Sequence, residues 1–246
     1  WIEYANKFDL QKQCDDMAAI FAEPLSEKDK KSHPTSSFTP QVDRSHFNSS
    51  QYWEQRYQQG GNSGVGSYNQ LAQYKADILN AFIKEHNVTS VAELGSGDGN
   101  QLKYYDFPEY AGFDVAETVV TRCRNLFAQN KNYSFYWLFD PNLKIEDHYD
   151  RYDMTMSIDV IYHLVEDPIF EDHMHTLFKM AKSYVVVYAS NEDTENYRLT
   201  AHVRHRKFTN FIEKNYPEWS LLEHIDNPHK HVDTCPSDFF IFHKKL

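Results

Sequence analysis

The chain has 246 residues, of which 41% are hydrophobic, and its 36 acidic against 25 basic side chains give a formal net charge of −11. This length fits one large domain, or one domain with an extension, and the apolar content is sufficient for a buried core. The acidic balance argues against nucleic acid as the main partner, because phosphate binding requires a basic surface. No apolar run is long enough to predict a membrane span.

The composition of the chain changes near residue 50. Residues 1–50 are polar and irregular, contain Pro24, Pro34 and Pro40, and show helix-like apolar spacing only over residues 2–21. We interpret this part as an N-terminal helix and linker, and residues 51–246 as one regular domain. Because residue 1 is Trp rather than Met, we expect the sequence to be a piece of a longer chain.

From residue 51 the pattern predicts an alternation of helices and strands. An aromatic helix around residues 52–57 and a glycine-rich loop over 60–66 precede an amphipathic helix, whose apolar face carries Leu71, Tyr74, Ile78, Leu79, Phe82 and Ile83. Strands are predicted over 88–94, 110–114, 133–139, 152–158, 184–189, 220–225 and 237–243, and helices over 100–105, 116–129, 169–182 and 205–215. Regular alternation predicts a parallel sheet covered by helices on both faces, and the last two strands can pair as an antiparallel edge.

The first strand runs into a glycine loop. Residues 91–99 read Val-Ala-Glu-Leu-Gly-Ser-Gly-Asp-Gly. Gly95, Gly97 and Gly99 allow a tight turn and a close approach of a ligand to the backbone. A nucleotide-like ligand is therefore expected at the carboxyl end of this strand.

The spacing of the loop excludes two common nucleotide motifs. A dinucleotide fingerprint would have its third glycine at the position where this chain has Asn100. A P-loop requires a lysine directly after its last glycine, but the first lysine after this glycine loop is Lys103. The observed order is E-x-G-x-G-x-G.

Three later strands each end at an acidic residue. The segment Tyr-Ala-Gly-Phe leads to Asp114, the β-prone run over 133–139 leads to Asp140, and the strand over 152–158 leads to Asp159. A carboxylate after the second strand can accept hydrogen bonds from both hydroxyls of a ribose. Each acid can equally cap the helix that follows it.

The ordered set of glycine loop and acids resembles the motifs of class I S-adenosylmethionine-dependent methyltransferases. The resemblance implies a Rossmann-like, seven-stranded α/β fold, mostly parallel with an antiparallel strand near the C-terminus and helices on both faces. It also implies S-adenosylmethionine as cofactor. The residues that it assigns to cofactor binding are Glu93, Gly95, Ser96, Gly97, Gly99, Asp114, Val115, Asp140 and Ser157.

The segment after the fourth strand lies where the family places the transferable methyl group. A hydroxyl acceptor needs a base as its proton leaves, and His163 titrates near neutral pH. We therefore expect His163 to be the base, with Asp159 orienting it or acting instead. The alternative is a histidine that only packs or forms hydrogen bonds.

Two segments are candidates for acceptor binding. The loop over 60–66 either folds over the cofactor or substrate, with Ser63, Ser67 and Tyr68 in contact, or is a plain hinge. The cationic cluster over 202–207 either meets an acidic or phosphorylated substrate or is paired with the abundant carboxylates. The predicted acceptor residues are Tyr68, Tyr162, His202, Arg204, His205 and Arg206.

The cysteines and histidines suggest no metal centre. Cys14, Cys123 and Cys235 are widely spaced, which predicts reduced thiols and a cytoplasmic location, with Cys123 in the core. The neighbours of His224 and His229 lack the ligand spacing of a structural zinc site. Asp159, Glu166 and Asp167 offer carboxylates in principle, but we expect a metal-free site.

The acceptor is suggested by resemblance only. Four segments, Gly-Gly-Asn-Ser-Gly, the glycine loop, Ser-Ile-Asp-Val-Ile-Tyr-His-Leu and His-Val-Arg-His-Arg-Lys-Phe, resemble small methyltransferases of polysaccharide pathways. This resemblance implies an O-methyltransferase acting on a sugar hydroxyl of a glycan or nucleotide sugar, fused to or associated with a glycosyltransferase. The alternatives are an N-methyltransferase or other small-molecule methyltransferase, and a non-catalytic interaction module. The acids at positions 93, 114 and 140 argue against the last.

Overall fold

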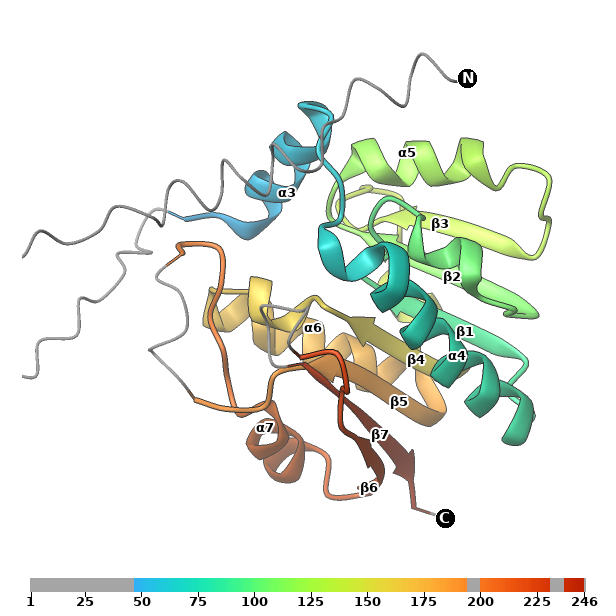
Figure 1. The fold of residues 1–246 in the computed structure, drawn as a ribbon, viewed down its shortest axis with the longest axis vertical. Coiled ribbons are helices and arrows are strands. Elements are labelled where there is room, and N and C mark those ends of the chain that lie inside the picture. Colours follow the sequence, from blue (N-terminus) through green and yellow to red (C-terminus); the bar gives the residue numbers. More distant parts are fainter. Residues whose placement is uncertain (1–46, 194–199, 231–236, 246) are drawn as a thin grey trace, which may run out of the picture. The chain divides into compact units, whose positions relative to one another are not determined.

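The computed structural model describes residues 47–193, 200–230 and 237–245, and these form one seven-stranded sheet (Figure 1). The strand order is β3-β2-β1-β4-β5-β7-β6, and β1 to β5 pair in parallel. Only β7 is antiparallel to both of its neighbours. The strands are β1 (Ser90–Leu94), β2 (Glu109–Asp114), β3 (Tyr133–Trp137), β4 (Tyr152–Ile158), β5 (Ala181–Ala189), β6 (Trp219–Ile225) and β7 (Asp238–Lys244). The predicted mostly parallel α/β fold is confirmed.

Helices connect the parallel strands. Asn48 caps α3 by accepting a hydrogen bond from the backbone N–H of Gln51. The helices are α3 (Ser49–Gln58), α4 (Asn69–Glu85), α5 (Glu117–Leu126), α6 (Asp167–Met180) and α7 (Phe208–Asn215), and the short 3₁₀ turns are η2 (Val65–Ser67), η3 (Gln101–Tyr104), η4 (Ile145–His148) and η5 (Ile161–His163). The predicted N-terminal appendage lies almost entirely outside the described residues.

The two faces of the sheet carry separate hydrophobic cores. Successive strand residues alternate between them, as a period of two requires: Val91 packs on the face of α4 and α5, and Ala92 packs on the face of α6 and α7. Because β1, β4 and β5 are covered on both faces, their side chains are almost wholly buried. This burial holds the carboxyl ends of the strands in place.

Several predicted elements differ from the structure in length or type. The helix expected from residue 205 begins at Phe208, because Arg204 and Arg206 extend along residues 162–165 and bond to their carbonyls. The strand expected to reach residue 139 ends at Trp137, where the chain turns. The helix expected over 100–105 is the single 3₁₀ turn η3.

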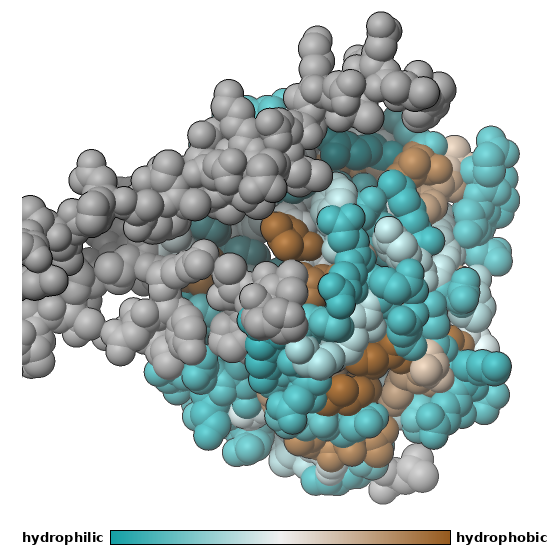
Figure 2. All heavy atoms as spheres, viewed as in Figure 1, coloured by the Kyte–Doolittle hydropathy of each residue, from teal (hydrophilic) through white to brown (hydrophobic). Residues whose placement is uncertain are grey.

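The described surface is mostly hydrophilic. Figure 2 shows hydrophilic side chains over most of one face, with a smaller hydrophobic area low in the view. Within the described ranges, the helices are too short or too polar to cross a membrane. Cys123 is fully buried, as predicted, whereas Cys14 and Cys235 lie outside the described residues.

Candidate functional site

A pocket opens at the carboxyl ends of β1, β2 and β4, where the strand order reverses between β1 and β4. Open α/β sheets bind ligands at this point. About 780 Å³ of unfilled space, open solvent included, lies among its lining residues. The lining residues are Trp53, Tyr57, Ser63, Ser67, Glu93, Gly95, Ser96, Gly97, Asp98, Gln101, Asp114, Val115, Leu138, Ile158, Asp159, Val160, His163, Leu164 and His173.

The pocket collects the two predicted catalytic residues and most of the predicted cofactor residues. Asp159 and His163 both line it. Among the predicted cofactor residues, Gly99, Asp140 and Ser157 lie outside the lining, and the other six lie within it. Of the predicted acceptor residues, none belongs to the lining in the described part of the chain.

The glycine loop follows β1 and needs its glycines at two positions in the pocket. Gly97 has φ +58°, and a Cβ there would lie 2.4 Å from Ser63 Oγ. Gly95 has φ +86°, and a Cβ there would lie 2.4 Å from a methyl carbon of Val160. Both positions therefore exclude any side chain. Gly99 instead packs against Cys123.

Asp114 ends β2 beside the glycine loop. One carboxylate oxygen accepts a hydrogen bond from the Gly97 backbone N–H at 2.9 Å, and the other accepts one from Ala116 at the same distance. Burial raises the pKa of Asp114 to about 6, although these backbone N–H groups oppose the shift. A carboxylate offers about four lone-pair sites, so acceptor sites for a ligand hydroxyl remain.

Glu93 lies on β1 beneath the loop and is 4% exposed. Its carboxylate accepts a hydrogen bond of 2.5 Å from the Tyr110 hydroxyl. Burial raises the pKa of Glu93 to about 7, although Tyr110 and the charge of Lys75 act against the shift. This side of the pocket therefore carries a carboxyl group that titrates near neutral pH.

Asp159 follows β4 with φ +59° and is held by two side chains. The ammonium group of Lys75, which is 1% exposed, lies 2.5 Å from one carboxylate oxygen. The Tyr162 hydroxyl donates to the other oxygen at 3.0 Å. The carboxylate is thus engaged at both oxygens, which suits an orienting group better than a free base.

His163 lies at the end of η5, and one of its ring nitrogens forms a hydrogen bond within the protein. Its Nδ1 is 2.9 Å from the backbone carbonyl oxygen of His202. A carbonyl only accepts, so Nδ1 carries the proton and the Nε2 lone pair is free. The ring packs edge-on against Trp53 and stacks on the ring of His202. Burial lowers the pKa of His163 to about 4, so the expected titration near neutral pH is wrong and the imidazole is neutral at physiological pH.

The loop over 60–66 is fastened to the glycine loop. Asp98 accepts hydrogen bonds from the Ser63 backbone N–H at 3.0 Å and from the Tyr68 hydroxyl at 2.8 Å. In return the Asp98 backbone N–H donates to Ser63 Oγ at 2.9 Å. The Tyr57 hydroxyl lies 3.1 Å from the same Oγ. Ser63 and Ser67 line the pocket, so this loop forms one of its walls.

His173 of α6 lines the pocket and was not identified from the sequence. Its Nε2 lies 2.9 Å from Ser157 Oγ, and burial lowers its pKa to about 4. The buried residues Phe170, Met174 and Leu177 mark the sheet-facing stripe of α6. His173 is three residues after the first and four before the last, so helical periodicity alone could have placed it there.

The cationic cluster over 202–207 is engaged within the protein. Arg204 and Arg206 both form ion pairs with Asp167, at 2.8 and 3.0 Å. Arg206 also donates to the carbonyl oxygens of Leu164 and Val165. These contacts match the alternative in which the basic residues are paired with carboxylates. They fasten the segment that carries His163.

The other predicted residues lie outside the lining of the pocket and have partners within the protein. His205 is buried and its Nδ1 is 2.6 Å from Ser190 Oγ. His202 stacks between the rings of Tyr52 and His163. Asp140 accepts from the Asn142 backbone N–H in the turn after β3, and Leu138 reaches the pocket instead.

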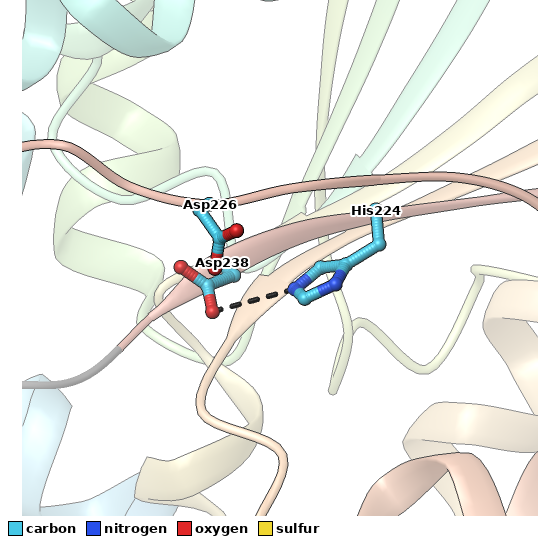
Figure 3. A group of neighbouring side chains, drawn as sticks. All are labelled: His224, Asp226 and Asp238. Carbon is cyan, nitrogen blue, oxygen red and sulfur yellow. Dashed lines mark hydrogen bonds and ion pairs between the residues drawn. The ribbon is translucent and has the colours of Figure 1, made fainter.

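One group of metal-ligand type occurs among the described residues, at the β6–β7 edge (Figure 3). It consists of His224, Asp226 and Asp238, with His224 Nε2 pointing to Asp238 at 3.4 Å. The ammonium of Lys230 lies 2.8 Å from Asp238 and 3.7 Å from Asp226. A protein cation therefore already balances these carboxylates.

Comparison with known proteins identifies relatives by structure. No family model and no curated protein sequence matches the chain. The N-methyltransferase NodS from Bradyrhizobium japonicum WM9, solved with S-adenosyl-L-homocysteine, superposes with a TM-score of 0.61 at 14% identity over 81% of this chain and 100% of its own. Magnesium protoporphyrin IX methyltransferase (ChlM) from Synechocystis PCC 6803, with the same ligand, gives 0.56 at 14% identity over 82% and 98%. The methyltransferase domain of bacterial CtHen1-C gives 0.52 at 19% identity over 71% and 98%.

These similarities establish the fold. At such identities they carry no information on the acceptor, which already differs among the proteins named. The seven-stranded sheet of this chain is that of class I S-adenosylmethionine-dependent methyltransferases.

Proposed function

We propose that this protein is an S-adenosylmethionine-dependent O-methyltransferase that acts on a sugar hydroxyl of a glycan or nucleotide sugar. The observation that carries the proposal is the position of His163. His163 lines the same pocket as the glycine loop and Asp114, and its Nε2 has no hydrogen-bond partner among the described residues. A neutral imidazole in the pocket can accept the proton that a hydroxyl acceptor loses.

The residues of the pocket fit the cofactor. Gly95 and Gly97 leave room that a Cβ would fill, and Asp114 retains acceptor sites for the hydroxyls of a ribose. Gln101 donates to the Ala72 carbonyl, but its buried Oε1 has no hydrogen-bond partner in the described structure. A buried acceptor without a partner is costly, so a donor group of a ligand at this position would satisfy it. When bound, S-adenosylmethionine supplies an electrophilic methyl group.

The protein's part in the reaction is to align the acceptor and to take its proton. His163 Nε2 would accept the hydroxyl proton, while Nδ1 stays bonded to the His202 carbonyl and keeps the ring oriented. Asp159, held by Lys75 and Tyr162, is proposed to orient the acceptor or the imidazolium that forms. Orientation of this kind accounts for much of the rate of such transfers.

The sugar acceptor rests on the sequence resemblance to polysaccharide-pathway methyltransferases. The catalytic domain is proposed to be residues 51–246, with residues 1–50 as an appendage. An association with a glycosyltransferase and a cytoplasmic location belong to the same proposal.

The test is methyl transfer from radiolabelled S-adenosylmethionine to a panel of glycans, nucleotide sugars and amines. We expect label in a sugar fraction, lost in Gly97→Val and Asp114→Ala proteins that bind S-adenosylhomocysteine weakly in calorimetry. Label in an amine instead would replace the O-methyltransferase proposal by an N-methyltransferase. If the parent protein shows no calorimetric binding of S-adenosylhomocysteine, the methyltransferase proposal itself is wrong.

A further inference from the structure

Arg56, on α3, is a cation next to Trp53, which lines the pocket. Among the described residues it forms no ion pair, in contrast to Arg204 and Arg206. Its guanidinium carbon lies 5.5 Å from the centre of the Trp53 ring. Trp53 lines the pocket and packs edge-on against His163, with ring centres 4.9 Å apart. The guanidinium is therefore one aromatic ring away from the proposed base.

The side chain of Arg56 is held in place from one side only. Its Nε donates to the carbonyl oxygen of Asn62 at 2.8 Å. The loop can pass this close because residue 61 is Gly: a Cβ there would lie 2.8 Å from Arg56 Cγ. The interactions described use Nε and the flat face of the group, so the two Nη nitrogens stay available as a planar pair of donors.

The nearby carboxylates are engaged elsewhere. Glu54 accepts from the Thr118 hydroxyl and backbone N–H, and Asp98 accepts from Ser63 and Tyr68. Asp159 is paired with Lys75. Arg56 thus has no ion-pair partner among the described residues, and the hydrogen-bond donors that hold Glu54 and Asp98 are neutral groups.

The two histidines beside Arg56 are neutral. Burial lowers the pKa of both His163 and His202, and the charge of Arg56 lowers them further. A positive group here opposes protonation of His163, which keeps the base free.

We propose that the Nη nitrogens of Arg56 bind a carboxylate or phosphate group of the methyl acceptor. Two parallel N–H donors match the two oxygens of either group, and a charge-assisted pair of this kind is stronger than neutral hydrogen bonds. The inference rests on the proposed function, since it names the chemical class of the acceptor. It places the binding site for an anionic group of the acceptor at Arg56 on α3, and not at Arg204 and Arg206, which form ion pairs with Asp167.

The test uses the full chain saturated with S-adenosylhomocysteine. Three probes are titrated: D-glucuronate, α-D-glucose 1-phosphate and the neutral methyl α-D-glucopyranoside. Binding is followed by the indole N–H signal of Trp53 in nuclear magnetic resonance spectra, assigned with Trp53→Phe. We expect at least one anionic probe to bind more tightly than the neutral one, and the two anionic arms distinguish carboxylate from phosphate.

The variants distinguish the effect of the guanidinium group from the effect of a positive charge alone. Arg56→Gln should weaken the anionic probe by at least about tenfold, and Arg56→Lys by less, while the neutral probe and S-adenosylhomocysteine bind as before. Arg151→Gln is the matched control, because Arg151 is half-exposed and precedes β4 at the opposite end of the sheet. Equal binding of all three probes, or an Arg56→Gln protein that binds like the parent, would overturn the proposal. Failure of S-adenosylhomocysteine to bind the parent would instead overturn the proposed function, and the same titrations of the free protein would still test Arg56.

Discussion

Lys75 and Asp159 form a buried ion pair between α4 and the turn after β4, with 2.5 Å between the ammonium nitrogen and the carboxylate oxygen. The pair determines the conformation of the residue that follows β4. Asp159 has φ +59°, and a Cβ at Gly66 would lie 2.7 Å from its carboxylate. The helix α4 therefore positions the end of β4, which faces the position proposed for the methyl group.

Removing the lysine should destabilise the protein. Lys75→Met leaves the Asp159 carboxylate nearly buried without its counter-charge, and we expect a loss of about 3 kcal/mol in the free energy of unfolding. The double variant Lys75→Met with Asp159→Asn should regain at least half of this loss, because Asn tolerates positive φ and carries no charge. Urea denaturation of the single and double variants measures both. A Lys75→Met protein as stable as the parent would show that the pair contributes nothing.

Gly97→Ala should abolish binding of S-adenosylhomocysteine in calorimetry. The new Cβ would meet Ser63 Oγ at 2.4 Å, which forces the two loops apart. Gly60→Ala is the matched control: Gly60 also has positive φ, at +84°, but nothing lies within 4 Å of its Cβ position. We expect the control to cost about 1 kcal/mol of stability and to retain binding. Similar loss of binding in both variants would assign the effect to backbone strain alone.

His163→Ala should lower turnover by about 10²-fold or more and leave the affinity for S-adenosylhomocysteine nearly unchanged. The parent should show a specific pH dependence. Because burial lowers the pKa of His163 to about 4, the base form is populated from about pH 5 upward, and His163 should contribute no inflection to the turnover profile in the range where an exposed histidine titrates. Steady-state kinetics between pH 5 and 8 measure this. An inflection near pH 6.5 that disappears in His163→Ala would contradict the buried, neutral state.

Glu93→Gln should stabilise the protein at alkaline pH. The folded-state pKa of Glu93, about 7, exceeds the ordinary value of 4.5, so between these values the native state binds more protons than the unfolded state. The free energy of unfolding therefore falls as pH rises through this window, by at most about 3 kcal/mol from this group.

The Glu93→Gln protein lacks this pH-dependent loss of stability. Its free energy of unfolding should therefore exceed that of the parent at pH 8 but not at pH 4. Urea denaturation at both pH values checks it. Glu109→Gln, half-exposed on β2, is the control and should change stability by less than about 0.5 kcal/mol at either pH. No difference between Glu93→Gln and the control at pH 8 would show that Glu93 titrates normally.

Deletion of residues 1–45 should leave binding of S-adenosylhomocysteine largely intact. The pocket is lined by residues from Trp53 onward, and α3 retains its cap at Asn48. Calorimetry, with circular dichroism to verify folding, measures the outcome. Loss of folding on deletion would place the N-terminal segment in the core.

The strand pattern was readable because buried parallel strands are continuous apolar runs. The strand predicted over 152–158 has those bounds in the structure, and the glycine loop lies where the motif indicates. Local spacing could not show how residues 204–206 are held, because their partners lie about forty residues earlier in the chain. Because of these tertiary contacts, the predicted start of the helix is irregular backbone, and the helix begins at Phe208.

Single polar residues within apolar stripes were the part of the site that was missed. Lys75 lies four residues from both Leu71 and Leu79, on the buried face of α4, and His173 has the same relation to the stripe of α6. Helical spacing identifies the face, but it does not identify the partner: Asp159 and Ser157 come from a different element in each case.

The reciprocal hydrogen bonds between Asp98 and Ser63 bear on exchange of the ligand. The loop over 60–66 forms one wall of the pocket and is fastened to the glycine loop, so any opening of this wall must break these contacts. The residence time of a spent cofactor then depends on how often the hydrogen bonds between Asp98 and Ser63 break, and not on affinity alone. Ser63→Ala should accordingly shorten that residence time, so the hydrogen bonds between Asp98 and Ser63 would influence the rate of repeated turnovers.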